Sequence, residues 1–387
     1  MLSSTSVQNQ PRRVHRLAVG CFFSLQGLSF ASWGSRIPTI QQQMGLSETA
    51  LGGVLLALPL GLLLSLPLAG WMIAKVGSRS VLLAAGVLYC ATLVAIGYAT
   101  SPLQLVMALF VFGFGGNLMN ISVNTQGVGV EALYQKSIMA SFHGLWSLAG
   151  FTGAAIGTLM IGEGVSPFHH FLLIMALSIV AIALASRFVL REDVNTDADK
   201  PIFVMPDKSL IDLGVICFFA MICEGAMFDW SGVYFKKVLG AENAWIGAGY
   251  TAFMCTMAGT RFVADWFTSR FGLQRILQAS GVLTASGLLI AVLLPHLYTA
   301  IVGFLLVGAG ISAVVPLLYS AAGKSKVMSP GVALAAVSTI GFFGFLIGPP
   351  LIGFIAGATS LRISFTVIAV MGLSIAVVAT RSKSIAS

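Results

Sequence analysis

Residues 80–100 read SVLLAAGVLYCATLVAIGYAT and contain no charged side chain. A hydrocarbon core about 30 Å thick needs roughly 20 apolar residues in a helix that rises about 1.5 Å per residue. This stretch is therefore long enough to cross a bilayer as a single helix. Its apolar and polar residues do not alternate, so it does not fit a strand of a membrane β-barrel.

Similar apolar runs fill almost the whole chain. Hydrophobic residues make up 57% of its 387 positions and charged residues only 9%. A soluble domain has about 25% charged residues, so the composition excludes a water-soluble globule. We predict an all-α membrane protein with twelve transmembrane helices, near residues 17–38, 49–74, 80–99, 102–130, 137–162, 167–190, 210–236, 244–269, 273–294, 297–323, 330–357 and 361–380.

A polar stretch near the middle divides these helices into two sets. Residues 191–208 hold five acidic and three basic residues. This pattern predicts a bundle of six helices on either side of a cytoplasmic linker, with boundaries at residues 1–190, 191–209 and 210–387. Trp33 and Trp230 are 197 residues apart, and Gly113 and Gly308 are 195 apart. Such spacing suggests that the second half repeats the first, a known plan of transporters.

The placement of basic residues predicts the topology. The formal net charge is +8. With twelve spans, both termini lie on one side, and that side holds seventeen of the 21 Lys and Arg residues. Only Arg36, Lys236, Lys237 and Arg362 lie on the other side. The positive-inside rule then places both termini in the cytoplasm, with the protein in the inner membrane. Because the basic residues are spread over seven segments, a nucleic-acid surface is not expected.

The loop after the second span resembles a family motif. Residues 70–79 read GWMIAKVGSR, which is similar to the G-x-x-x-D-x-x-G-x-R loop of the major facilitator superfamily, except that Ala74 replaces the acid. The related segment of the second half, residues 259–272, keeps an acid and an arginine four residues apart. The resemblance implies gating roles for Gly70, Gly77, Arg79, Arg261 and Asp265.

Three longer sequence segments resemble those of a bacterial branch of this superfamily that is related to the fucose permeases. They are VNTQG at 123–127, SFHGLWS at 141–147 and EGAMFDWS at 224–231. The resemblance implies two six-helix halves that alternate around a central site. Sugar–proton symporters of this type carry acids in their first and fourth spans. Here those spans offer Gln26 and Asn120 but no central acid, so the proton site is not carried over.

The fourth and fifth spans supply polar and aromatic candidates for binding a solute. Asn117, Asn120 and Asn124 follow one helical face. They could line a polar cavity or hydrogen-bond neighbouring helices. In the fifth span Trp146 could stack on a flat ligand, and His143 could exchange a proton near neutral pH or serve as a structural donor.

The first span carries a polar stripe of Gln26, Ser29, Trp33 and Arg36. Its spacing places these residues on one helical face. Gln26 and Trp33 are candidates for the binding site, whereas Arg36 is expected to extend its charged end to the membrane surface.

The seventh span holds two carboxylates, Glu224 and Asp229. An acid in hydrocarbon costs about 2.5–3.5 kcal/mol even on the lenient insertion scale. We expect Glu224 and Phe228 to share a face toward the cavity. Asp229, about 140° away around the helix, is expected near the outer gate with Lys236 or Lys237 as its partner. Either acid could instead belong to a fixed interhelical ion pair.

These residues predict a secondary active transporter for a small sugar- or polyol-like solute. Glu224, Asp229 and His143 are the candidates for proton coupling, since burial disfavours the charged form of a carboxyl. Alternatives are an efflux carrier for hydrophobic or cationic compounds and a membrane-embedded enzyme acting on lipid. The chain has no HExxH, GxSxG or phosphate-binding loop, and its five cysteines form no CxxC pair. We therefore expect no catalytic activity, cofactor or metal, and a monomer whose partners are the solute, protons and the bilayer.

Overall fold

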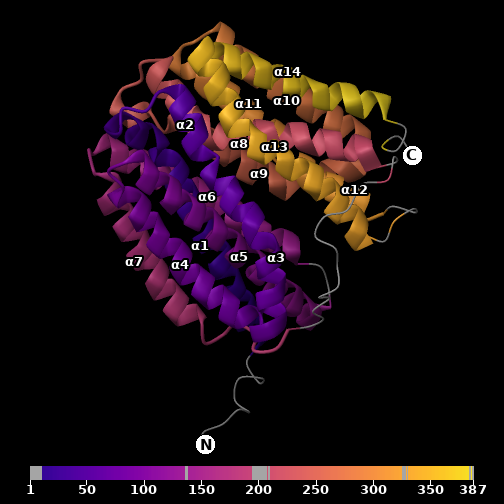
Figure 1. Ribbon diagram of the computed structural model, residues 1–387. Helices are drawn as coiled ribbons and strands as arrows, with labels where there is room; N and C mark the ends of the chain where they lie inside the picture. The colour runs from indigo at the N-terminus through magenta and orange to yellow at the C-terminus, as the bar shows by residue number, and fades with distance from the viewer. Residues whose placement is uncertain are drawn as a thin grey trace, which may run out of the picture. The chain divides into compact units, whose positions relative to one another are not determined.

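The computed structural model is helical throughout the residues it describes, which are 11–135, 138–193, 207, 210–324, 328, 330–382 and 385 (Figure 1). Within them, eleven segments are long and apolar enough to cross a membrane. The helix Ala248–Phe271 is the twelfth candidate, and it carries the charged residues Arg261, Asp265 and Arg270. Each of the twelve spans predicted from the sequence corresponds to one such segment.

The chain forms two compact units. Unit 1 contains the chain up to Trp33, Ala57–Gly153 and Ser166–Asp199, and unit 2 contains Gly34–Leu56, Ala154–Val165 and the chain from Lys200. The helices of unit 1 are α3 (Ala57–Val76), α4 (Ser78–Tyr98), α5 (Pro102–Tyr134), α7 (Pro167–Ala185) and the first parts of α1 (Arg12–Gln43) and α6 (Met139–Gly162). Within this unit, α5 packs against α3 and α4, and α4 packs against α7.

Unit 2 contains the later helices together with the ends of α1 and α6. Its helices are α2 (Glu48–Leu55), α8 (Ile211–Lys237), the 3-10 turn η2 (Asn243–Trp245), α9 (Ala248–Phe271), α10 (Leu273–Leu293), α11 (Leu297–Ile311), α12 (Val314–Ala322), α13 (Pro330–Ala358) and α14 (Leu361–Arg381). In Figure 1, α10 and α14 lie side by side in this unit, and the two helices are in extensive contact. Helix α8 packs against α13 and α14.

Two of the predicted spans are each divided into two helices by a proline. Helix α2 ends at Leu55, four residues before Pro59, and α11 ends at Ile311, five residues before Pro316. A proline ring clashes with the carbonyl four residues earlier and offers no N–H to it. The helix therefore breaks at that carbonyl, and the second helix begins just beyond it. Pro67, Pro349 and Pro350 instead lie inside unbroken helices.

Contacts of glycine residues confirm the internal repeat. A Cβ built at Gly113 of α5 would lie 2.0 Å from the carbonyl oxygen of Leu58 in α3. A Cβ built at Gly308 of α11 would lie 2.3 Å from the carbonyl oxygen of Phe253 in α9. Gly113 and Gly308 are 195 residues apart, and Leu58 and Phe253 are also 195 residues apart. Small residues let helix backbones approach closely where lipid supplies no hydrophobic driving force.

The repeat extends to the turns. Gly77 precedes α4 with φ 81° and ψ 150°, and Gly272 precedes α10 with φ 82° and ψ 155°. Positive φ is readily available only to glycine, so both turns require this residue. The two halves therefore use the same backbone turn at the same place in the repeat.

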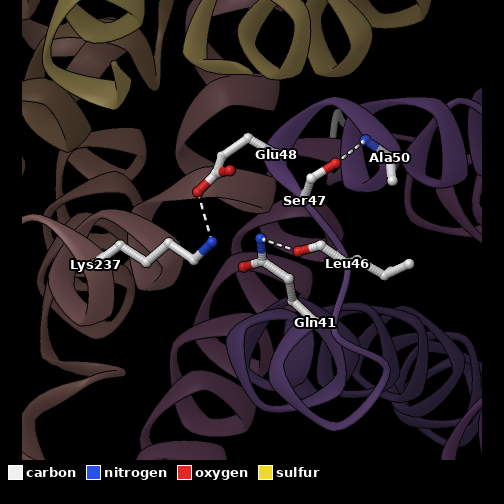
Figure 2. A network of polar contacts seen from close by, with 6 residues as sticks. All are labelled: Gln41, Leu46, Ser47, Glu48, Ala50 and Lys237. Atoms are coloured by element: carbon white, nitrogen blue, oxygen red, sulfur yellow. Dashed lines mark hydrogen bonds and ion pairs between the residues drawn. The ribbon is translucent and has the colours of Figure 1, made fainter. Parts of the chain in front are cut away.

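Polar contacts hold α2 and the end of α1 to the end of α8 within unit 2 (Figure 2). The Oγ atom of Ser47 accepts from the backbone N–H of Ala50 at 3.2 Å, and so caps α2. The Nε2 atom of Gln41 donates to the carbonyl of Leu46 at 3.1 Å. Lys237 and Glu48 form an ion pair at 2.5 Å. The break at Pro59 thus leaves a short helix, α2. Ser47 caps its N-terminus, and Glu48 in its first turn pairs with Lys237 of α8.

Substituting Gly308 by Ala is expected to lower the thermal unfolding midpoint of the purified protein. The added methyl would overlap the carbonyl of Phe253, and overpacking costs about 1–3 kcal/mol. Gly113→Ala is expected to act in the same way. Gly259 of α9 has nothing within 4 Å of its Cβ position, so Gly259→Ala is the control and should leave the midpoint unchanged or raise it, because alanine favours the helix. Equal midpoints for Gly308→Ala and the control would contradict the close approach.

Candidate functional site

A buried ion pair joins α8 to α9 within unit 2. The Oε1 atom of Glu224 lies 3.5 Å from the Nη2 atom of Arg261. The exposed fraction of the side chain is 13% for Glu224 and 18% for Arg261. An isolated charge in a membrane span is costly, and pairing reduces that cost. The small remaining exposure means that both groups can still be reached by water or a small polar molecule.

The guanidinium of Arg261 has a second partner that the helix break supplies. Its Nε atom donates to the carbonyl oxygen of Ser312 at 3.2 Å. This carbonyl lies four residues before Pro316, which has no N–H to offer it. A backbone acceptor inside hydrocarbon must find a donor. Arg261 therefore satisfies two needs, the charge of Glu224 and the carbonyl left open by the proline.

Hydroxyl and thiol groups surround this pair. The hydroxyl of Tyr319 in α12 interacts with the side chains of Cys217 in α8 and Ser338 in α13. Tyr319 and Cys217 are also electrostatic neighbours of Glu224. The site thus brings together a carboxylate, a guanidinium and neutral hydroxyls from α8, α9, α12 and α13. Such a set can both accept hydrogen bonds from a polar solute and donate them to it.

Asp229 lies apart from this pair, as its position on α8 predicts. It is 9% exposed, and among the described residues no hydrogen bond or ion pair reaches its carboxylate. The expected partners are engaged elsewhere, because Lys236 donates to Gln42 and Lys237 pairs with Glu48 (Figure 2). The lysines extend toward α1 and α2, which pack at the end of α8, so the predicted pairing with Asp229 is wrong.

Phe228 is buried against aromatic rings. It is 5% exposed and makes edge contacts with Tyr250 and Phe253 of α9, with ring centroids 6.3 and 5.6 Å apart. It therefore helps to pack α8 against α9, beside the segment that carries Glu224.

In unit 1, two of the predicted carboxamides bond neighbouring helices. The Nε2 atom of Gln26 donates to the carbonyl of Gly116 in α5 at 3.0 Å, while its Oε1 atom is buried without a partner in the described structure. The Nδ2 atom of Asn117 donates to Ser65 at 2.7 Å and to the carbonyl of Leu62 at 3.3 Å, both in α3. Asn117 therefore joins α5 to α3, whereas Gln26 keeps a buried acceptor without a partner in the described structure.

The other unit 1 candidates are more accessible, apart from Trp33. Asn120 is exposed and accepts at 2.7 Å, through its backbone carbonyl, from the Nδ2 atom of Asn124. His143 is exposed and contacts the edge of Phe23, with ring centroids 5.2 Å apart. Trp146 is half-buried against Phe30 with centroids 6.2 Å apart. Trp33 is 1% exposed. Their roles as solute contacts remain predictions.

The loop before α4 replaces its missing acid with a residue from another part of unit 1. Asp193 accepts hydrogen bonds from the backbone N–H of Ser78, at 2.7 Å, and from its hydroxyl. Gln126 of α5 donates to the Ser78 hydroxyl at 2.8 Å and to the carbonyl of Leu190 at 3.0 Å. Arg79 donates to the carbonyl of Ser186 at 3.1 Å. An acid at the start of a helix satisfies free N–H groups and the positive end of the helix dipole.

Of the remaining gating candidates, Arg261 lies inside α9, where it pairs with Glu224. Its gating role stays a prediction. Gly77 has the positive φ described above, and nothing lies within 4 Å of the Cβ position at Gly70. The side chain of Asp265 lies outside the described part of the structure. The sequence did not single out Asp193 or the Ser312 carbonyl, although Pro316 and the absence of an acid at position 74 were signals for them.

Comparisons with known proteins agree with this architecture. The family model of the Major Facilitator Superfamily matches residues 18–326, and the chain belongs to that family. An uncharacterised transporter of this type from Yersinia pestis is 34% identical over 367 residues, which are 95% of each chain.

Solved structures show the same fold. The nucleoside transporter NupG has a TM-score of 0.75 at 13% identity, over 95% of this chain and 98% of its own. The fucose:proton symporter FucP of E. coli has a TM-score of 0.62 at 15% identity, over 97% of this chain and 100% of its own. The predicted twelve-helix fold in two halves is confirmed, and the protein is a multi-pass membrane transporter.

Glu224→Gln and Arg261→Gln should each lower the thermal unfolding midpoint, because each leaves a charge without its partner in a membrane span. The double variant should recover most of the loss, since two neutral carboxamides can hydrogen-bond each other. Contacting residues show coupling energies of roughly 0.5–3 kcal/mol. Glu242→Gln, on an exposed carboxylate of unit 2, is the control. Strictly additive losses would contradict the ion pair.

Asp193→Ala should speed amide hydrogen exchange at the start of α4, because removal of a capping carboxylate costs about 0.5–2 kcal/mol. Mass spectrometry of peptides covering residues 77–82 measures the effect. The adjacent Glu192 is exposed, so Glu192→Ala is the matched control and should leave the exchange unchanged. The capping role is refuted if both variants exchange at the wild-type rate.

Proposed function

We propose that the protein carries a small, hydroxyl-rich polar solute across the inner membrane by alternating access, with proton coupling and both termini in the cytoplasm. The observation that carries this proposal is the Glu224–Arg261 pair with its surrounding hydroxyls. The structural likeness to NupG, a nucleoside transporter, and to FucP, a fucose:proton symporter, supports the same class of solute.

The chemistry of the pair favours a neutral solute. A hydroxyl group can donate to the carboxylate of Glu224 and accept from the guanidinium of Arg261. Neighbouring hydroxyls of a sugar, polyol or ribose can therefore bind both groups without breaking their charge balance. On unit 1, the same proposal assigns hydrogen bonds to Gln26 and Asn120 and stacking to Trp146.

Export of lipophilic cations is less well supported. A cation site in a membrane needs a carboxylate whose charge is available. Glu224 is already neutralised by Arg261 at 3.5 Å. A cation entering here would meet the repulsion of the guanidinium as well as the attraction of the carboxylate. The ion pair therefore favours a neutral polar solute.

Uptake by proteoliposomes of purified protein tests the proposal. The panel contains radiolabelled sugars, polyols and nucleosides, with tetraphenylphosphonium as the lipophilic cation, under an inward proton gradient. We expect uptake of at least one polar compound, and a loss of tenfold or more in Glu224→Gln and Arg261→Gln. The exposed-site variant Glu242→Gln should transport at the wild-type rate. Transport of the cation alone, or wild-type rates in both site variants, would overturn the assignment.

A further inference from the structure

Asp229 differs from Glu224 in having no counter-charge. Its side chain is nine-tenths buried, and no hydrogen bond or ion pair reaches it from the described residues. Glu224, on the same helix, has Arg261 at 3.5 Å. Leaving a buried charge without a partner is strongly destabilising. Of the two carboxyls of α8, Glu224 therefore has a cation beside it, and Asp229 has none among the described residues.

The surroundings of Asp229 are closely packed. Its neighbour Tyr250 of α9 is 1% exposed, and the Tyr250 hydroxyl makes no hydrogen bond within the described structure. A Cβ built at Gly34 of α1 would lie 2.9 Å from that hydroxyl and 3.2 Å from the carbonyl oxygen of Phe228. Helix α1 thus packs directly over this part of α8 and α9. The Asp229 carboxyl and the Tyr250 hydroxyl therefore lie where α1, α8 and α9 pack together.

The charged groups on the elements packed against α8 do not compensate Asp229. Arg261 of α9 pairs with Glu224, and Arg362 of α14 donates to the carbonyl of Val292. Lys236 and Lys237 contact Gln42 and Glu48. Arg36 of α1 is 1% exposed and has interactions of its own.

The uncharged titratable groups on these elements are tyrosines and the exposed Cys255 of α9. Tyr319 of α12 belongs to the Glu224 site. Tyr298 is in α11, and α13 has no titratable residue in its sequence. Among the described residues, none of these groups forms a hydrogen bond or ion pair with the Asp229 carboxyl.

We propose that Asp229, and not Glu224, carries the coupling proton, and that its carboxyl is protonated while α1 covers it. This inference rests on the proposed function. Glu224 stays ionised with Arg261 and holds the solute. Asp229 releases its proton when movement of α1 away from α8 and α9 admits water, which stabilises the carboxylate. The two tasks of a symporter are then divided between two acids of one helix.

Infrared difference spectroscopy of the full-length protein in lipid nanodiscs tests the protonation without any solute. The two acids differ in residue type, so isotope labelling distinguishes them. We expect a protonated-carboxyl band at neutral pH that shifts when the protein is labelled with [4-¹³C]aspartate and does not shift with [5-¹³C]glutamate. The band should be lost in Asp229→Asn and kept in Glu224→Gln. Asp212→Asn, at the start of the same helix, is the matched control and should keep it.

Tyr250→Phe provides a readout if Asp229→Asn does not fold. Removal of the neighbouring hydroxyl should shift the frequency of the aspartate band without removing it. A band that follows the glutamate label, or the absence of a protonated carboxyl in the wild type, would overturn the inference.

Uptake of the sugar, polyol and nucleoside panel tests the coupling. For a transported compound, Asp229→Asn should retain exchange across the membrane while gradient-driven accumulation falls to the equilibrium level. Accumulation at the wild-type level in this variant would overturn the role of Asp229. The failure of every panel compound to be transported would count against the proposed function, and the infrared result would still decide where the proton lies.

Discussion

The contact of Arg261 with Glu224 and with the carbonyl of Ser312 is the interaction on which the arrangement of unit 2 depends. In surroundings of low dielectric constant, an unpaired carboxylate and an unpaired backbone carbonyl are each destabilising. The guanidinium of Arg261 pairs with both groups, because its planar fork can donate in two directions. The contact also joins α8, α9 and the α11–α12 break. A charged site can exist at this position because a proline has already opened the neighbouring helix.

The different surroundings of the two acids follow from helical geometry. Glu224 and Asp229 are five residues apart, so they project about 140° from each other around α8. One faces Arg261, and the other is enclosed beside Tyr250. Had the spacing been three or four residues, both acids would have met the same neighbours. The five-residue spacing places Glu224 beside Arg261 and leaves Asp229 without an ion pair among the described residues.

In the loop before α4, a residue from another segment supplies the acid at the start of the helix. Ala74 cannot supply a charge, yet the first amide of α4 still needs an acceptor. Asp193 provides it from a segment more than a hundred residues away in sequence, and Gln126 holds that segment in place. In the second half, Gly272 keeps the same backbone turn as Gly77. The repeat has therefore conserved the backbone geometry while the polar contacts have diverged.

The sequence by itself determined the class of protein and the positions of the twelve spans. These features depend on a local quantity, the length of an apolar run against bilayer thickness. The prolines alone did not show which helices break, because Pro67, Pro349 and Pro350 lie inside unbroken helices. The internal repeat was also visible, because glycines that allow close helix contact recur at a fixed spacing. The tertiary structure alone decided which polar groups meet. Arg261 reaches Glu224, and Lys237 reaches Glu48 instead of Asp229, because these pairings depend on which helices pack together, and spacing along the chain does not specify that.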